Sequence, residues 1–249
     1  MLSKATQKWI RSLEHKRFRQ ESGLFIAEGN KLTSDLLEIL PCRLIAASTA
    51  WLARNSPVKA KEIISTDQET LNKVSQLKNP QEVLGVFEIP DYKLRPEDLK
   101  GKLNLALDNI QDPGNLGTIL RIADWFGIGC VICSKDTVDA FNPKTVQATM
   151  GAIGRVKLIY TDLESFIPQT RLPVFGTFLE GDIIYSCQLP KEAIVVMGNE
   201  GNGISHSIES LINKKLFIPD YPLGKTGSES LNVSVATAII CSEFRRRCF

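Results

Sequence analysis

Three loops hold the residues of this chain whose types and spacing could do chemistry: residues 108–117, 198–205 and 219–230. Each loop is rich in glycine or small polar residues and follows a short apolar run that is typical of a buried strand. Such runs alternate with helical patterns, which predicts a largely parallel sheet. Ligands of parallel sheets bind beyond the carboxyl ends of the strands, so we expect the three loops to line one site.

The second loop, GNEGNGIS, has three glycines within six residues: Gly198, Gly201 and Gly203. Glycine accepts positive φ and lets a ligand approach the backbone closely. The spacing is not the GxGxxG of dinucleotide-binding sites, and no GK[ST] follows as in a P-loop. The loop is therefore either a backbone-lined site for another ligand or a mobile turn.

Arg121 lies four residues beyond Gly117, close to the loop end of a predicted helix. The apolar stripe of that helix includes Ile119 and Ile122, so the Arg121 side chain projects away from the core. It is either a surface arginine, for example one paired with Asp124, or an arginine directed into the site.

Other catalytic systems are not indicated. The two histidines, His15 and His206, belong to no HExxH, GxSxG or Walker pattern. Cys130 and Cys133 have CxxC spacing but lie in a strand-like run, where alternate side chains face opposite ways. No second CxxC accompanies them, so we interpret them as core residues and expect no metal site.

The composition is that of a globular protein, with 43% hydrophobic and 23% charged residues and a formal net charge of +2. Contacts with nucleic acid must therefore come from local patches. One candidate is the basic start of the chain, which either binds RNA phosphates or is an ordinary solvated helix face. Its basic residues are Lys4, Lys8, Arg11, Lys16, Arg17, Arg19 and Lys31.

No apolar segment approaches the roughly 18 residues of a membrane span. The first residues also lack the apolar core of a signal peptide. We therefore expect no membrane partner and a cytoplasmic location, in which the cysteines stay reduced.

The chain divides into two predicted α/β domains. Residues 1–90 alternate strands and helices, residues 91–102 form a linker with two prolines, and residues 103–249 form the second domain. The chain ends in a helix that is apolar on every side, with Ser230 as its predicted N-cap. Such a helix is either buried in its own domain or covered by a second subunit.

Taken together, the three loops resemble motifs 1, 2 and 3 of the SpoU/TrmH family of RNA 2′-O-ribose methyltransferases, which belong to the SPOUT class. The matching stretches are NIQDPGNLGTILRIADWFG (109–127), IVVMGNEGNGIS (194–205) and LFIPDYPLGKTGSESLNVSVATAII (216–240). The first domain resembles the L30e-like RNA-binding domain of some members, on SLEHKRFRQESGLFIAEGNKL (12–32).

The resemblance implies a trefoil knot at the carboxyl end, a homodimer and S-adenosylmethionine as the cofactor, held largely by backbone groups. It implies that the cofactor-binding positions are Thr177, Gly198, Asn199, Gly203, Ile218 and Leu231. It implies that the positions linked to catalysis are Asn115, Arg121, Glu200, Ser230 and Asn232. The third motif departs from the family pattern, because an insertion near Tyr221 to Thr226 lengthens its loop by about four residues.

The chemistry that this family performs requires alignment above all. The methyl group sits on a sulfonium, a strong electrophile, which must meet a ribose 2′-oxygen. A neutral arginine base is hard to reach because the arginine pKa exceeds about 12. We therefore expect Arg121 to hold a phosphate or the developing alkoxide while another group takes the proton.

Three alternatives stay open at this point. The chain could be an RNA-binding assembly factor that has lost catalysis, or it could act on tRNA where we favour rRNA. It could also be a small-molecule α/β enzyme, which would leave the basic first domain unexplained. The presence of Arg121, Glu200, Ser230 and Asn232 favours an active methyltransferase.

Overall fold

A computed structural model describes residues 2–222 and 230–248. The chain forms two compact units, Met1–Asp91 with Asp139–Arg155 and Tyr92–Val138 with Val156–Phe249. No helix within the described ranges is long and apolar enough to span a membrane.

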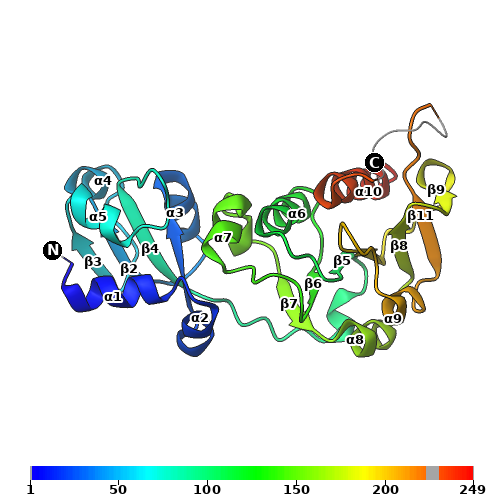
Figure 1. Cartoon of the computed structure of the whole chain (residues 1–249), viewed down its shortest axis with the longest axis horizontal. Coiled ribbons are helices and arrows are strands. Elements are labelled where there is room, and N and C mark those ends of the chain that lie inside the picture. The colour runs from blue at the N-terminus through cyan, green and yellow to red at the C-terminus, as the bar shows by residue number, and fades with distance from the viewer. Residues whose placement is uncertain (1, 223–229, 249) are drawn as a thin grey trace. The chain divides into compact units, whose positions relative to one another are not determined.

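The first unit is built on a four-stranded sheet in the order β1-β4-β2-β3 (Figure 1). β4 runs antiparallel to β1 and β2, and β3 runs parallel to β2. The strands are β1 (Leu24–Glu28), β2 (Cys42–Ala47), β3 (Glu62–Ser65) and β4 (Val83–Glu88). The helices are α1 (Lys4–Ser12), α2 (Lys16–Ser22), α3 (Asn30–Leu37), α4 (Thr49–Arg54) and α5 (Gln68–Val74). The small α/β domain expected from the alternating pattern is therefore present.

Residues 139–155, which the sequence prediction places in the second domain, pack instead with the first unit. They contain α7 (Pro143–Thr149) and the short 3₁₀ helix η2 (Ala152–Gly154). Arg19, only 2% exposed, forms an ion pair of 2.5 Å with Asp139, and the ring of Phe25 lies 5.0 Å from that of Phe141. Hydrophobic periodicity cannot reveal such pairings across more than a hundred residues.

The second unit contains a seven-stranded sheet in the order β7-β6-β5-β10-β8-β11-β9. Every neighbouring pair is parallel, which confirms the predicted sheet type. The strands are β5 (Leu103–Leu107), β6 (Val131–Ser134), β7 (Leu158–Thr161), β8 (Val174–Phe178), β9 (Asp182–Ile183), β10 (Ala193–Met197) and β11 (Lys214–Phe217). The helices are α6 (Pro113–Trp125), α8 (Leu163–Thr170), α9 (His206–Glu209) and α10 (Val233–Arg246), with 3₁₀ helices η1 (Pro96–Leu99) and η3 (Ile184–Ser186).

The path of the chain at the β9 edge is unusual. β11 lies between β8 and β9, although β8 and β9 follow each other in the chain. Residues 179–181 must therefore cross β11. Gly181 makes this possible: its φ is +145°, and an added Cβ would lie 2.8 Å from the carbonyl oxygen of Lys215. The crossing is a feature that a knotted chain needs, and the complete trefoil knot stays a prediction.

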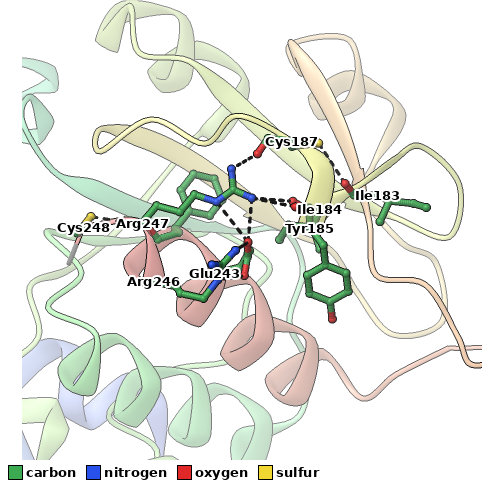
Figure 2. Close-up of polar contacts among 9 residues, drawn as sticks. Ile183, Ile184, Tyr185, Cys187, Glu243, Arg246, Arg247 and Cys248 are labelled. Carbon is green, nitrogen blue, oxygen red and sulfur yellow. Dashed lines mark hydrogen bonds and ion pairs between the residues drawn. The ribbon is translucent and has the colours of Figure 1, made fainter.

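The last turn of α10 anchors the segment that follows β9, as Figure 2 shows. Arg247 donates hydrogen bonds to the carbonyl oxygens of Ile184, Tyr185 and Cys187. Its guanidinium is held in turn by Glu243, whose Oε1 lies 2.8 Å from Nη2 of Arg247 and 2.7 Å from Nη2 of Arg246. Hydrogen bonds from Arg246 and then Arg247 lower the pKa of the buried Glu243 carboxyl from 4.5 to about 2.

The pKa of Glu243 predicts a pH-dependent contribution to stability. A carboxyl whose pKa is lowered by folding stabilises the fold above its ordinary pKa, and this contribution is lost as the pH falls toward the folded value. We expect Glu243→Gln to lower the free energy of unfolding by about 2 kcal/mol at pH 7, the scale of hydrogen bonds to a charged group. Urea unfolding at several pH values should show this deficit shrinking between pH 4.5 and about 2.

The matched control is Glu180→Gln, which changes an exposed carboxylate on the β8–β9 connection. It should alter the free energy of unfolding by less than about 0.5 kcal/mol at every pH. A deficit in Glu243→Gln that stays constant down to pH 2.5 would show that the charge of Glu243 is not its source.

Candidate active site

The loops after β5 and β10 lie side by side, because these two strands are neighbours and parallel in the sheet. The buried carboxylate of Asp108 accepts a hydrogen bond from the backbone N–H of Ser205 at 2.7 Å. The side-chain amide of Asn199 donates to the carbonyl of Asn109 at 2.8 Å. The carboxyl edge of the sheet therefore brings the first two loops into direct contact, as the sequence predicts.

Glu200, Asn115 and Asn232 form a hydrogen-bonded triangle that joins the first loop, the second loop and the start of α10. Oε1 of Glu200 accepts from Nδ2 of Asn115 at 2.9 Å and from Nδ2 of Asn232 at 2.5 Å. The third side is a bond of 2.9 Å from Nδ2 of Asn232 to Oδ1 of Asn115. Three of the five positions linked to catalysis by resemblance are thus brought together, from segments up to 117 residues apart.

Helix N-termini position two of these three side chains. Asp112 caps α6 by accepting from the N–H of Asn115 at 2.8 Å, and Pro113 begins that helix. Asn232 caps α10: its Oδ1 accepts from the N–H of Ser234 at 3.1 Å while its Nδ2 faces the triangle. Glu200 also accepts from the N–H of Val233 at 3.2 Å, where a negative charge suits the helix dipole.

The prediction of Ser230 as the N-cap of the last helix is wrong, because Asn232 occupies that position and the helix begins at Val233. Serine and asparagine are about equally good caps, so local preference could not separate them. The bonds from Asn232 to Asn115 and Glu200 make the difference, and they are tertiary contacts. Ser230 is exposed.

The glycine loop is closed on itself by backbone hydrogen bonds. Asn199 and Gly203 exchange two such bonds, of 2.9 and 2.8 Å. The side chain of Asn199 accepts from the N–H of Gly201 at 2.8 Å and from that of Asn202 at 3.1 Å. A Cβ on Gly198 would lie 2.4 Å from the backbone of Gly203, whereas one on Gly203, with φ of +69°, would meet nothing within 4 Å. The loop is rigidly built and leaves open space on the side of Gly203.

The remaining predicted residues do not join the triangle. Arg121 is exposed on α6 and makes no polar contact with any other described residue. Thr177, at the end of β8, has a hydroxyl that contacts the carbonyl of Val196 at 3.4 Å. Ile218 is half-buried after β11, and Leu231 is 48% exposed before α10. Of the predicted insertion, Tyr221 and Pro222 are exposed, and residues 223–226 lie outside the described ranges.

Sequence reasoning missed two positions that shape the site. Asp108 ties the end of β5 to the start of α9, and Asn109 has a positive φ of 58° that turns the chain out of the strand. Both positions could have been found from the sequence, because they are the first two polar residues after an apolar strand, in a loop already expected to carry function.

Burial raises the pKa of the Cys130 thiol to about 12, as befits a core residue. Among the described residues, no cluster of three His, Cys, Asp or Glu side chains could hold a metal ion.

Comparisons with known proteins identify both units. Residues 102–242 match the SpoU rRNA Methylase family, and residues 5–85 match the MRM3-like substrate binding domain. The 23S rRNA (guanosine(2553)-2'-O)-methyltransferase RlmP of Bacillus subtilis is 28% identical over 94% of this chain and 94% of its own. Human mitochondrial rRNA methyltransferase 3 is 35% identical over 92% of this chain and 69% of its own.

Solved structures give the same picture. A TrmH-family protein of Porphyromonas gingivalis has a TM-score of 0.89 and 38% identity, covering 99% of both chains. The AdoMet-bound rRNA methyltransferase of Sinorhizobium meliloti has a TM-score of 0.83 and 30% identity, covering 100% of this chain and 97% of that one.

The triangle predicts energetic coupling between α6 and α10. In a double-mutant cycle, Asn115→Ala and Asn232→Ala should together cost less than the sum of the single changes, with a coupling energy of about 1 kcal/mol. Both single variants remove the same hydrogen bond. The double variant cannot lose that bond twice, so its cost in free energy of unfolding is smaller than the sum of the two single costs. Urea unfolding at pH 7 measures all four proteins.

The control cycle pairs Asn232→Ala with Asp162→Ala, since Asp162 caps α8 and shares no hydrogen-bond partner with Asn232. These two changes should add to within about 0.5 kcal/mol. Additivity in both cycles would mean that the triangle contributes nothing to the fold.

Proposed function

Because the chain belongs to the SpoU rRNA methylase family, we propose that it transfers a methyl group from S-adenosylmethionine to a ribose 2′-hydroxyl of ribosomal RNA. The observation that carries this proposal is the triangle of Asn115, Glu200 and Asn232, which joins the three motifs beside a glycine loop. rRNA is favoured over tRNA because relatives that align with both units, such as the enzyme of Bacillus subtilis, act on rRNA.

The site fits the cofactor in its chemistry. The face of the glycine loop near Gly203 is free of side chains and exposes backbone groups, which suit the polar atoms of a nucleoside. The apolar side chains of Ile218 and Leu231, partly exposed at the same edge of the sheet, suit its adenine ring. Gly198, Asn199, Gly203, Ile218, Leu231 and Thr177 would hold S-adenosylmethionine, which supplies a methyl group on a positively charged sulfur.

Arg121 is the residue that we assign to the substrate. It follows Asn115 by six residues, about 9 Å along the same helix axis, so the triangle fixes the helix that carries it. Its guanidinium is exposed and unpaired among the described residues. A guanidinium fork of this kind stabilises a phosphate or a developing alkoxide, and another group or water takes the proton of the 2′-hydroxyl.

The first unit is proposed to hold the RNA. Lys4, Lys8, Arg11 and Lys16 on α1 and α2 are exposed, which leaves them free to contact phosphates. Arg19 does not belong to this patch, although the sequence analysis grouped it there, because it is buried in the ion pair with Asp139.

A cytoplasmic location is part of this proposal, and the six free cysteines agree with a reducing compartment.

We also propose a homodimer through α6 and α10. These helices pack on each other, and they display apolar residues outward: Trp125 is 85% exposed, and Val235 is 48% exposed. α10 buries the opposite side, with Val233, Ile240 and Phe244 in the core. Packing within its own unit therefore explains the apolar residues on one side of α10 only. Contact with a second copy of the chain would explain the apolar residues on the exposed side.

Methylation of total rRNA by the purified protein, followed by mapping of 2′-O-methyl sites, tests the activity. Arg121→Lys should lower kcat by about 100-fold, because a single ammonium cannot reproduce the forked hydrogen bonding. Its affinity for S-adenosylmethionine, measured by calorimetry, should change less than threefold or so, since Arg121 binds substrate.

Arg171→Lys is the matched control, because Arg171 is an exposed arginine of the same unit with no side-chain contact in the described residues. It should keep full turnover. Near-full turnover in Arg121→Lys would refute the role of the forked guanidinium, and the absence of any ribose methylation by the unmodified protein, with the cofactor bound, would favour the inactive assembly factor.

Substitution of Trp125 tests the dimer. We expect Trp125→Glu to convert the protein from dimer to monomer in light scattering coupled to size exclusion, because a charge would be buried at the interface. The control is Ile63→Glu, which changes an apolar residue of β3 that is 46% exposed on the first unit. It should leave the mass unchanged. A monomeric unmodified protein, or a dimeric Trp125→Glu, would contradict the proposal.

A further inference from the structure

The first unit contains a cavity of about 370 Å³ that the proposed chemistry does not use. It lies between the end of β1, the segment after α5, and α7, and all its lining residues belong to this one unit. Its volume is in the range of pockets that hold small ligands, roughly 300–1,000 Å³. It therefore has room for one nucleobase.

Glu28 is the charged group of the cavity. It is only 5% exposed, and its carboxylate is held by Ser75 Oγ and by the backbone N–H of Gln76 at 2.8 Å. Each of these donors occupies one position on one oxygen, and an ionised carboxylate accepts about four hydrogen bonds. The carboxylate is thus fixed in orientation and still able to accept. Burial raises the pKa of Glu28, and hydrogen bonds donated by a ligand would stabilise the ionised carboxylate against this effect.

The other lining groups complement a flat, polar-edged ring. Leu77 and Ala148, which are partly exposed, offer apolar surface to its faces, and the buried Ile26 lies at the cavity wall. The side-chain amides of Gln76 and Gln147 have no partner within the described ranges, so both can donate to a carbonyl. Lys144 is exposed at the rim, where an ammonium can meet a phosphate.

Among the four RNA bases, guanine matches this set best. Its N1–H and N2 amino group are adjacent donors, which suit the two oxygens of a carboxylate, and its O6 is an acceptor for an amide. Adenine and cytosine each place an acceptor nitrogen beside their amino group, and uracil has one N–H between two carbonyls. An acceptor facing Glu28 would be repelled, so these three bases fit less well.

We propose that this cavity binds an unpaired guanine of the RNA, with Glu28 accepting from N1–H and the N2 amino group and with Gln147 donating to O6. The inference rests on the proposed function for the nature of the ligand. Specific recognition of RNA targets unpaired bases, whose edges and faces are accessible in this way. The site would select one segment of the RNA.

The experiment compares two RNA pentamers, AAGAA and its inosine counterpart AAIAA, by fluorescence anisotropy with the full chain. Saturating S-adenosylhomocysteine keeps the nucleotides out of the cofactor site. Inosine lacks only the N2 amino group, so the guanine pentamer should bind about tenfold more tightly, the effect of one hydrogen bond to a charged group. Guanosine 5′-monophosphate should compete more weakly than AAGAA, and equal competition would overturn the assignment to RNA.

Substitutions test which side chains of the cavity produce the preference for guanine. Gln147→Leu should reduce the preference for AAGAA over AAAAA several-fold, and Glu28→Gln should remove the discrimination against inosine. Gln20→Leu is the matched control for the first, since Gln20 is exposed on α2 of the same unit, and it should keep the full preference. If Glu28→Gln fails to fold in a thermal melt, Gln147→Leu still decides the question.

Equal affinity for AAGAA and AAIAA, or an unchanged preference in Gln147→Leu, would overturn the proposal. Ribose methylation of rRNA is measured on the same preparations. Equal affinity of the unmodified protein for AAGAA, AAIAA and AAAAA, with methylation intact, refutes the guanine site alone, whereas an unmodified protein that prefers guanine without methylating refutes the proposed function alone.

Discussion

One carboxylate oxygen, Oε1 of Glu200, holds together three segments that are remote in the sequence. It accepts hydrogen bonds from the side chains of Asn115 and Asn232 and from the N–H of Val233. A charged acceptor with three donors is a strong and directional junction, and it sits where the positive end of the α10 dipole adds to its stability. The position of α6, and with it that of Arg121, follows from this junction. The glycine loop is fixed by the same contact, because Glu200 is part of it.

The far end of α10 is held as firmly as its beginning. Arg245 donates to the carbonyl oxygens of Phe126 and Gly127, at 2.7 and 2.6 Å, just beyond the end of α6. Arg247 binds the carbonyls of the η3 segment (Figure 2). This segment follows the crossing of β11 at Gly181. α10 is thus tied to α6 at both ends, and to the crossing segment at one. A short helix fixed in this way can carry site residues at its N-terminus with little freedom to shift.

Much of this arrangement follows from local sequence rules. Alternating strands and helices predict the parallel sheet, and polar loops after its strands predict the edge of the sheet at which the site lies. The resemblance to the family motifs then singled out Asn115, Glu200 and Asn232. What escaped prediction depends on pairings between distant residues. The segment 139–155 joins the first unit through Arg19 and Asp139, which local periodicity cannot connect. Similarly, Ser230 and Asn232 are equivalent caps until the bonds to Asn115 and Glu200 choose between them.

The bonding of the site also limits how it can work. Amides titrate neither as acids nor as bases near pH 7, and Glu200 is already engaged by three donors, so the triangle is suited to holding geometry. Methyl transfer from a sulfonium needs little more than an aligned oxygen that loses its proton, and correct alignment of reactants is worth several kcal/mol. The side chains of the triangle therefore fix the loops, and we propose that backbone atoms hold the cofactor. We propose that the exposed guanidinium of Arg121 meets the charge that develops on the substrate.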